Sequence, residues 1–107
     1  MKEDSLLLKL TSETPLFKII DFLVDNKGLE FTKKEIISGS KISRATFFNY
    51  FKIIEDYGIV KVTRKFGKTK LYSLNSTNMI VKKILDLEKE LISNALEKEK
   101  KKIILSS

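Results

Sequence analysis

The stretch that decides the fold is residues 32–60, TKKEIISGSKISRATFFNYFKIIEDYGIV, which contains two helix starts separated by a short turn. Thr32 and Glu35 form a capping box, in which each side chain accepts a hydrogen bond from the other residue's backbone N–H at a helix start. The helix that they open is short, because Ser38-Gly39-Ser40 is expected to end it. The sequence therefore predicts that Gly39 forms the turn between two helices.

The second helix has two faces of different character. It begins at Ser43, which has the residue type of an N-cap, and it ends before Gly58, where a left-handed residue is preferred. Apolar residues recur at i, i+3, i+4 and i+7 and predict the buried face: Phe47, Tyr50, Phe51 and Ile54. The opposite face carries side chains that can touch a ligand: Arg44, Ala45, Phe48, Asn49 and Lys52. A Phe on this face either meets an apolar partner or belongs to the core through a face assignment that is one position off.

Two β-like stretches follow the second helix, at residues 59–64 and 69–74. Their connection, residues 65–68, has Gly67 in a position typical of hairpin loops. The predicted hairpin carries five cations and no acid: Lys61, Arg64, Lys65, Lys68 and Lys70. The side chain of Phe66 at its tip is either tucked under the hairpin or exposed.

Further helices flank this central part. One starts at Thr14-Pro15, since Pro is favourable at the first helical position, and it is followed by a strand of at most three residues at 29–31. After the hairpin, Ser76-Thr77 is expected to cap a long helix that reaches about residue 102. We therefore predict a mainly α-helical α+β fold, divided into a domain of residues 1–75 and a C-terminal helix of residues 76–107.

The positive charge of the chain is concentrated in its middle. The formal net charge is +7, and residues 27–72 alone carry nine Lys and two Arg against four acids. Residues 1–26 have a net charge of −2, and residues 73–107 have a net charge of +2. A basic block of this kind is typical of a polyanion partner, although Lys-rich surfaces also serve solubility alone.

The composition excludes several classes of function. The 107 residues include no Cys and no His, which excludes disulfides, zinc sites of thiolate or imidazole, Cys nucleophiles and His acid–base catalysis. The sequence has no phosphate-binding glycine loop, nucleophile–base pair or visible metal cluster, so we expect neither an enzyme nor a cofactor. Apolar runs are far shorter than a membrane span, and Leu6-Leu7-Leu8 is too short for a signal peptide. We expect a cytoplasmic protein with no membrane partner.

The order of these motifs resembles the winged helix-turn-helix transcriptional regulators, especially the small archaeal and bacterial kinds akin to the MarR, ArsR and PadR groups. The resemblance covers about residues 14–75, with residues 32–58 as the helix-turn-helix and 59–74 as the wing. The sequence departs from the usual pattern at Ile37, Ser40 and Lys41, where these families usually have Ala and then Leu-Gly. The resemblance implies double-stranded DNA as the partner.

A regulator of this kind places its recognition helix, here residues 43–57, in the major groove and its wing, here 61–70, on the backbone or minor groove. Arg44 is then suited to guanine, Asn49 to adenine, and Phe48 to a thymine methyl. The alternatives are a helix-start salt bridge for Arg44 and a merely solvated hairpin for the wing. The expected DNA-binding residues are Lys41, Ser43, Arg44, Thr46, Phe48, Asn49, Lys52, Arg64, Lys65, Lys68 and Lys70.

The long last helix is expected to form a homodimer. Its apolar residues follow a 4-3-4 spacing, which is typical of paired helices: Ile80, Ile84, Leu87 and Leu91. The apolar stretch Leu6-Leu7-Leu8-Lys9-Leu10 is expected to pack on this helix or on its partner. The alternative is that the helix folds back onto its own domain.

The sequence thus favours a homodimeric, sequence-specific DNA-binding transcriptional regulator. Two other functions remain open at this stage: a winged-helix module for protein–protein interaction, and a nonspecific architectural or plasmid-maintenance DNA binder. The sequence identifies no small-molecule effector.

Overall fold

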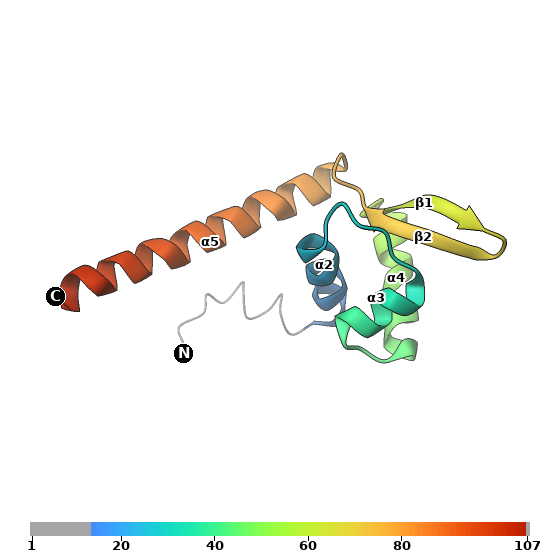
Figure 1. The fold of residues 1–107 in the computed structure, drawn as a ribbon, viewed down its shortest axis with the longest axis horizontal. Helices are drawn as coiled ribbons and strands as arrows, with labels where there is room; N and C mark the ends of the chain where they lie inside the picture. The colour runs from blue at the N-terminus through green and yellow to red at the C-terminus, as the bar shows by residue number, and fades with distance from the viewer. Residues whose placement is uncertain (1–13, 107) are drawn as a thin grey trace.

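The computed structural model describes residues 14–106, which form four helices and one two-stranded hairpin. The elements follow one another as α2 (Pro15–Asp25), α3 (Lys33–Ser40), α4 (Arg44–Asp56), β1 (Val60–Phe66), β2 (Thr69–Leu74) and α5 (Met79–Ser106). Three helices and the hairpin form one body from which α5 projects, so the molecule measures 61 × 27 × 20 Å (Figure 1). The α+β class predicted from the sequence is confirmed. The predicted packing of the apolar stretch at residues 6–10 lies outside the described residues.

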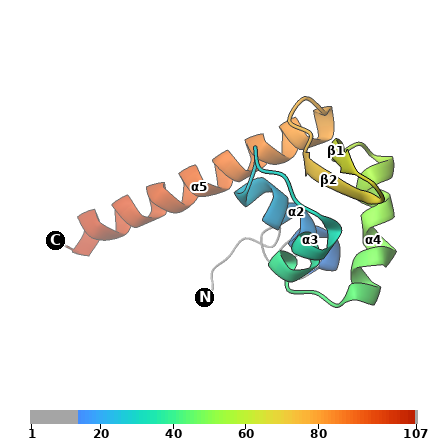
Figure 2. The same ribbon diagram turned by 45° about the vertical axis from the view of Figure 1, so that its right-hand side comes forward.

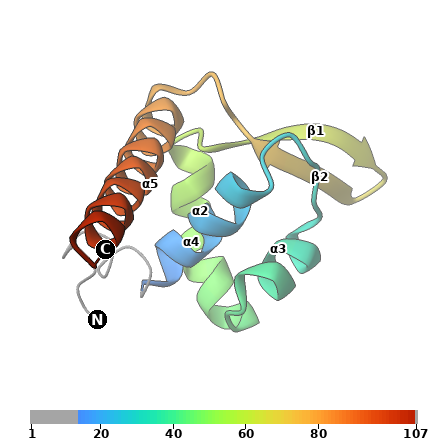
Figure 3. The same cartoon turned by 60° about the vertical axis from the view of Figure 1, so that its left-hand side comes forward.

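The helix α2 begins as its sequence predicts. The Thr14 hydroxyl accepts a hydrogen bond from the Phe17 N–H at 3.3 Å, and Pro15 is the first helical residue. Its inner face consists of four buried aliphatic side chains: Ile19, Ile20, Leu23 and Val24. This face packs against α3 and α4, so α2 is the central helix of the body (Figure 3).

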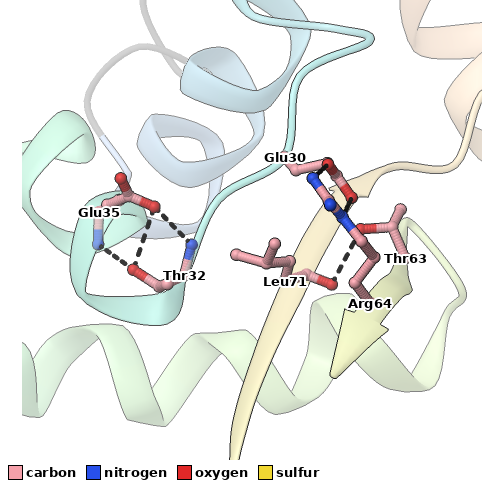
Figure 4. A network of polar contacts seen from close by, with 6 residues as sticks. All are labelled: Glu30, Thr32, Glu35, Thr63, Arg64 and Leu71. Carbon is pink, nitrogen blue, oxygen red and sulfur yellow. Dashed lines mark hydrogen bonds and ion pairs between the residues drawn. The ribbon is translucent and has the colours of Figure 1, made fainter. Parts of the chain in front are cut away.

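The capping box at the start of α3 is confirmed. The Glu35 carboxylate accepts from the Thr32 N–H at 2.8 Å, and the Thr32 hydroxyl accepts from the Glu35 N–H at 3.2 Å (Figure 4). These two bonds satisfy donors that a helix start leaves without intrahelical partners. They fix the position where the chain turns from its first helix into the helix-turn-helix segment.

The prediction that Gly39 forms the turn is wrong. Gly39 lies inside α3, where its missing side chain lets α3 approach the Phe22 ring of α2. A Cβ atom at Gly39 would lie within 2.6 Å of Phe22 Cδ1. The left-handed residue is Lys41, with φ of 58°, which ends α3 as its C-cap. A Lys in this conformation is uncommon, because its Cβ crowds the backbone.

The hairpin pairs β1 and β2 antiparallel, with Val60 opposite Leu74 and Phe66 opposite Thr69. β1 extends two residues beyond the predicted strand, so only Gly67 and Lys68 form the loop, and Gly67 has φ of 59°. The register shifts between Val62 and Arg64, which leaves Thr63 as the extra residue of a β-bulge.

The short strand expected at residues 29–31 is reduced to a single bridge. Phe31 and Tyr72 exchange two backbone hydrogen bonds of 2.8 Å, so β2 pairs with this segment on the side away from β1. The bridge attaches the hairpin to the chain just before α3. The bases of the hairpin and of the helix-turn-helix segment are therefore held together.

The helix α5 is capped by Asn78, not by Ser76 or Thr77 as predicted. The Asn78 Oδ1 accepts from the N–H groups of Ile80 and Val81 at 2.8 and 3.2 Å. The Thr77 hydroxyl instead donates to Asn75 at 2.9 Å. The Asn78 side-chain amide also donates to the Tyr57 carbonyl at 2.9 Å, which ties the start of α5 to the end of α4.

Only the first turns of α5 pack on the body. Val81 is fully buried, and Ile84 and Leu85 contact the core. Leu87, Glu88 and Leu91 still line a groove beside α2. Farther along, the helix extends away from the domain, and every side chain from Ile92 to Lys101 is exposed (Figure 2). Over its 28 residues an α-helix is about 42 Å long. The alternative in which the helix folds back over its own domain is therefore wrong for its C-terminal half.

Candidate nucleic-acid interface

The helix α4 separates a buried face from an exposed face, as its spacing predicts. Phe47, Phe51 and Ile54 are buried, and Tyr50 is half-buried against them. The exposed face carries Arg44, Ala45, Phe48, Asn49 and Lys52. Within residues 14–101, Arg44 forms no ion pair, so the helix-start salt bridge considered above is not formed there.

The hydroxyl of Ser43 is occupied by the cap of α4. Its oxygen accepts from the Thr46 N–H at 3.1 Å, and its O–H donates to the Thr46 hydroxyl at 2.8 Å. The two hydroxyls therefore act first as helix-capping groups. The Thr46 hydroxyl still has its own proton to donate, which leaves it suited to an acceptor outside the protein.

Phe48 is an outward-facing residue, with 44% of its surface exposed. Its ring packs at 82° on the buried Phe47 ring, with 5.2 Å between the centroids. The Arg44 guanidinium lies over the Phe48 ring at 5.1 Å from its centroid. The alternative in which Phe48 is a core residue is therefore wrong.

Sequence reasoning missed Lys33, which contributes a second cation to this face. Its ammonium lies 5.6 Å from the ring centroid of Phe48, 5.7 Å from that of Phe51 and 5.8 Å from that of Tyr72. Contacts of this kind are attractive, because the face of an aromatic ring is negative. The only signal in the sequence is a Lys at the first position of α3, next to its cap.

The cations of the hairpin are all exposed, but one of them is bound within the protein. The Arg64 guanidinium donates to Glu30, with Nη2 at 2.6 Å and Nε at 3.1 Å from the carboxylate oxygens (Figure 4). These hydrogen bonds from Arg64, helped by the nearby Thr63 hydroxyl, hold the pKa of Glu30 below its usual value. The same pairing raises the pKa of Arg64. The remaining cations, Lys61, Lys65, Lys68 and Lys70, are exposed and face no hairpin acid.

Two solved structures share the fold of this chain. Two structures of Lactococcus lactis ZitR each superpose on 94% of this chain. One is a mutant with a cysteine replaced by serine, and it has a TM-score of 0.56 and 19% sequence identity. The other is described as a zinc-responsive MarR family member, and it has a TM-score of 0.52 and 23% sequence identity. This chain has the winged helix-turn-helix fold. It spans 66% and 64% of the lengths of those two chains. No protein-family model and no curated protein matches the sequence.

In the winged-helix fold, α3 and α4 are the helix-turn-helix and the β1–β2 hairpin is the wing. Lys41 lies exposed in the turn between the two helices. The wing and α4 lie at the end of the molecule opposite the free end of α5, and the two views agree on this (Figures 1 and 2). The elements that carry the predicted DNA-binding residues, α4, the turn before it and the wing, therefore lie at this end of the molecule.

The tip of the wing carries an exposed aromatic residue. Phe66 is 58% exposed, which resolves the alternative left open by the sequence. The Arg64 guanidinium lies 5.8 Å from its ring centroid. Arg64 thus contacts both Glu30, in the segment before α3, and Phe66 near the tip of the wing.

Three of the four residues expected at a dimer interface, Ile84, Leu87 and Leu91, line α5 on the side of α2. Ile80 and Leu87 are 41% and 38% exposed, and Ile84 and Leu91 are half-buried. Between α2 and α5 the chain leaves an open groove of about 430 Å³, lined mainly by apolar side chains that include Phe17, Ile20, Leu87 and Leu91. An exposed apolar surface of this kind is typical of an interaction site.

Three carboxylates lie close together where α2 faces α5: Asp21 and Asp25 from α2 and Glu88 from α5. Their oxygens lie within 4.8 Å of one another, and they are the group in the described residues that could hold a metal ion. Partial burial, followed by repulsion from Asp25, raises the pKa of Asp21. Sequence spacing did not reveal this group, because Glu88 is far along the chain from the other two.

In residues 14–106 no helix is both long and apolar enough to cross a membrane.

Proposed function

We propose that this chain is a sequence-specific double-stranded DNA-binding transcriptional regulator that acts as a cytoplasmic homodimer. The observation that carries the proposal is the exposed face of α4, with its cations and hydrogen-bonding groups, beside a wing that has five cations and no acid. An α-helix of this kind fits the major groove of B-DNA, and its N-terminal residues reach the base edges. The proposal includes no catalytic activity.

In the complex, α4 reads the bases and the wing holds the backbone. Arg44 contacts guanine in a bidentate manner, and Asn49 contacts adenine. The remaining residues of α4 and its turn contact phosphates or nearby bases: Lys41, Ser43, Thr46 and Lys52. Arg64 retains N–H groups that Glu30 does not use, so it contacts a phosphate while it positions the wing. Lys65, Lys68 and Lys70 complete the wing contacts.

The homodimer forms through α5. The apolar groove beside α2 and the exposed Leu87 and Ile92 support this part of the proposal, because a second copy would cover them. Ile80, Ile84, Leu87 and Leu91 are the proposed contacts. Two recognition helices would then read half-sites separated by about 34 Å, one turn of DNA.

The decisive experiment is selection of bound duplexes from a random pool, combined with the mass of the protein in solution. We expect a near-palindromic site and the mass of a dimer. A protein–protein module would show no affinity for DNA, and a nonspecific architectural binder would show affinity without a preferred sequence. Either outcome would refute the proposal.

Matched variants test which cations bind phosphate. Lys68→Ala on the wing is expected to make the negative slope of log K against log salt less steep by about one, because one fewer counterion is released on binding. Lys89→Ala removes an exposed cation from α5 and is expected to leave the slope unchanged. Equal effects of the two substitutions would contradict the assigned interface.

A second pair of variants tests the dimer. Leu87→Lys places a charge on the proposed α5 interface and is expected to give a monomer in analytical ultracentrifugation. Leu29→Lys introduces the same charge at an exposed leucine before α3 and is expected to leave the dimer intact. A dimer that survives Leu87→Lys would exclude this face as the interface.

A further inference from the structure

The exposed face of α4 contains an aromatic side chain, Phe48, that contacts two cations. The Phe48 side chain is 44% exposed, and its ring packs on the buried Phe47 ring with 5.2 Å between the centroids. Arg44 and Lys33 lie on the Phe48 ring, with 5.1 and 5.6 Å from their charged groups to the ring centroid. Contacts within the protein thus place the ring on the outer face of α4.

An aromatic ring on this face restricts what α4 can bind. Phe48 offers no hydrogen bond, so a phosphate or a polar base edge placed against it would lose its hydration without compensation. In the major groove, the 5-methyl group of thymine is the apolar group that a protein can contact. The chemistry of Phe48 therefore selects thymine among the bases.

Arg44 determines the neighbouring base. Its guanidinium lies over the Phe48 ring, and its remaining N–H groups are free to bind the O6 and N7 atoms of guanine. The guanidinium carbon lies 5.1 Å from the ring centroid. Successive base pairs are about 3.4 Å apart along the DNA axis, so two groups at this separation, offset sideways from each other, can meet adjacent base pairs.

We propose that Arg44 and Phe48 act as one reading unit, which recognises a guanine and the methyl group of a thymine in adjacent base pairs. The proposal rests on the proposed function, because it requires that α4 binds the major groove. It makes Phe48 a specificity-determining residue and adds a defined two-base-pair element to each half-site.

The first test locates the thymine with the wild-type protein and the guanine with one variant, Arg44→Ala. In the selected site, each thymine is replaced in turn by deoxyuridine, which lacks only the 5-methyl group. Removing the methyl that Phe48 contacts is expected to weaken binding about fourfold, the effect of one buried methyl-sized group. Arg44→Ala is expected to relax the preference for one guanine, with a loss of about five- to 150-fold in affinity for the selected site. The proposal requires that this guanine and the sensitive thymine lie in adjacent base pairs.

The second test uses a matched pair of Phe variants. Phe48→Ala is expected to bind the thymine and deoxyuridine sites equally, whereas Phe66→Ala on the wing retains the fourfold difference. Circular dichroism verifies that both variants are folded. If all deoxyuridine sites bind wild-type protein equally, or if Phe48→Ala retains the difference, the reading unit is refuted while sequence-specific binding stands. If no duplex is preferred at all, the proposed function itself fails.

Discussion

Replacement of Gly39 by Ala tests the close contact between α3 and α2. In an exposed helix interior this change is stabilising by up to about 1 kcal/mol, because Ala has the higher helix propensity. Here the added methyl group would lie 2.6 Å from Cδ1 and 2.7 Å from Cζ of Phe22. Carbon atoms in favourable contact are about 3.5–4.0 Å apart, so the Phe22 ring must move by about 1 Å or more.

The Phe22 ring has little freedom to move. It packs on Phe31 with 4.8 Å between the ring centroids, and Phe31 is bridged to β2. Overpacking of this kind costs about 1–3 kcal/mol, and disturbing the aromatic pair adds about 0.5–1.5 kcal/mol. After the gain in helix propensity is subtracted, Gly39→Ala is expected to destabilise the fold by about 1–3 kcal/mol.

The free energy of unfolding is measured by urea denaturation of the wild type and the variant. A second substitution, Phe22→Leu, removes the ring and is expected to cost less in the Gly39→Ala background than alone, by at least about 1 kcal/mol. This coupling separates a local clash from a general loss of packing. A Gly39→Ala protein as stable as the wild type, or a coupling near zero, would refute the close contact of α3 with Phe22.

Two further substitutions test the turn and the wing. Lys41→Gly is expected to raise the free energy of unfolding in urea by about 0.5–1 kcal/mol, because Gly suits a φ of 58°. The control Lys34→Gly, inside α3, is expected to lower it by about 1 kcal/mol. A loss of stability at both positions would contradict the strained turn. Glu30→Gln weakens the contact with Arg64 and is expected to speed hydrogen exchange at the Tyr72 N–H. Because the pKa of Glu30 is lowered from 4.5, the contact acts fully above pH 4.5 and is lost as pH falls through the lowered pKa, so the two proteins should then exchange alike. A difference that persists below that pKa would show that charge is not its cause.

The local signals of the sequence predicted most of the fold. The capping box of α3, the cap of α4 at Ser43 and the left-handed Gly58 are interactions within a few residues, so their residue types are sufficient. The two faces of α4 follow from its helical period alone.

The errors arise where distant segments decide between local alternatives. Gly39 has the residue type of a turn, but contact with α2 requires a residue without a side chain there, and the turn falls to Lys41 instead. Asn78, rather than Thr77, caps α5, because its amide also binds the end of α4. Neither choice is visible in the sequence around these residues.

The sequence predicted which residues of the candidate site are exposed better than it predicted the contacts between them. The exposed residues of α4 follow from periodicity, but the contact between Glu30 and Arg64 joins residues 34 positions apart. Lys33 reaches the rings of α4 and β2 only because α3 lies across them. Such contacts depend on how the elements pack, which no local pattern encodes.

The hydrogen bond from Asn78 to the Tyr57 carbonyl joins the start of α5 directly to the end of α4. Since α5 is about 42 Å long, a tilt of about 5° at its start moves its far end by about 4 Å. Conversely, a displacement of several ångströms at the far end of α5 corresponds to a rotation of only a few degrees at its start. Movements of the outer turns of α5 would therefore reach the end of α4 only as small rotations.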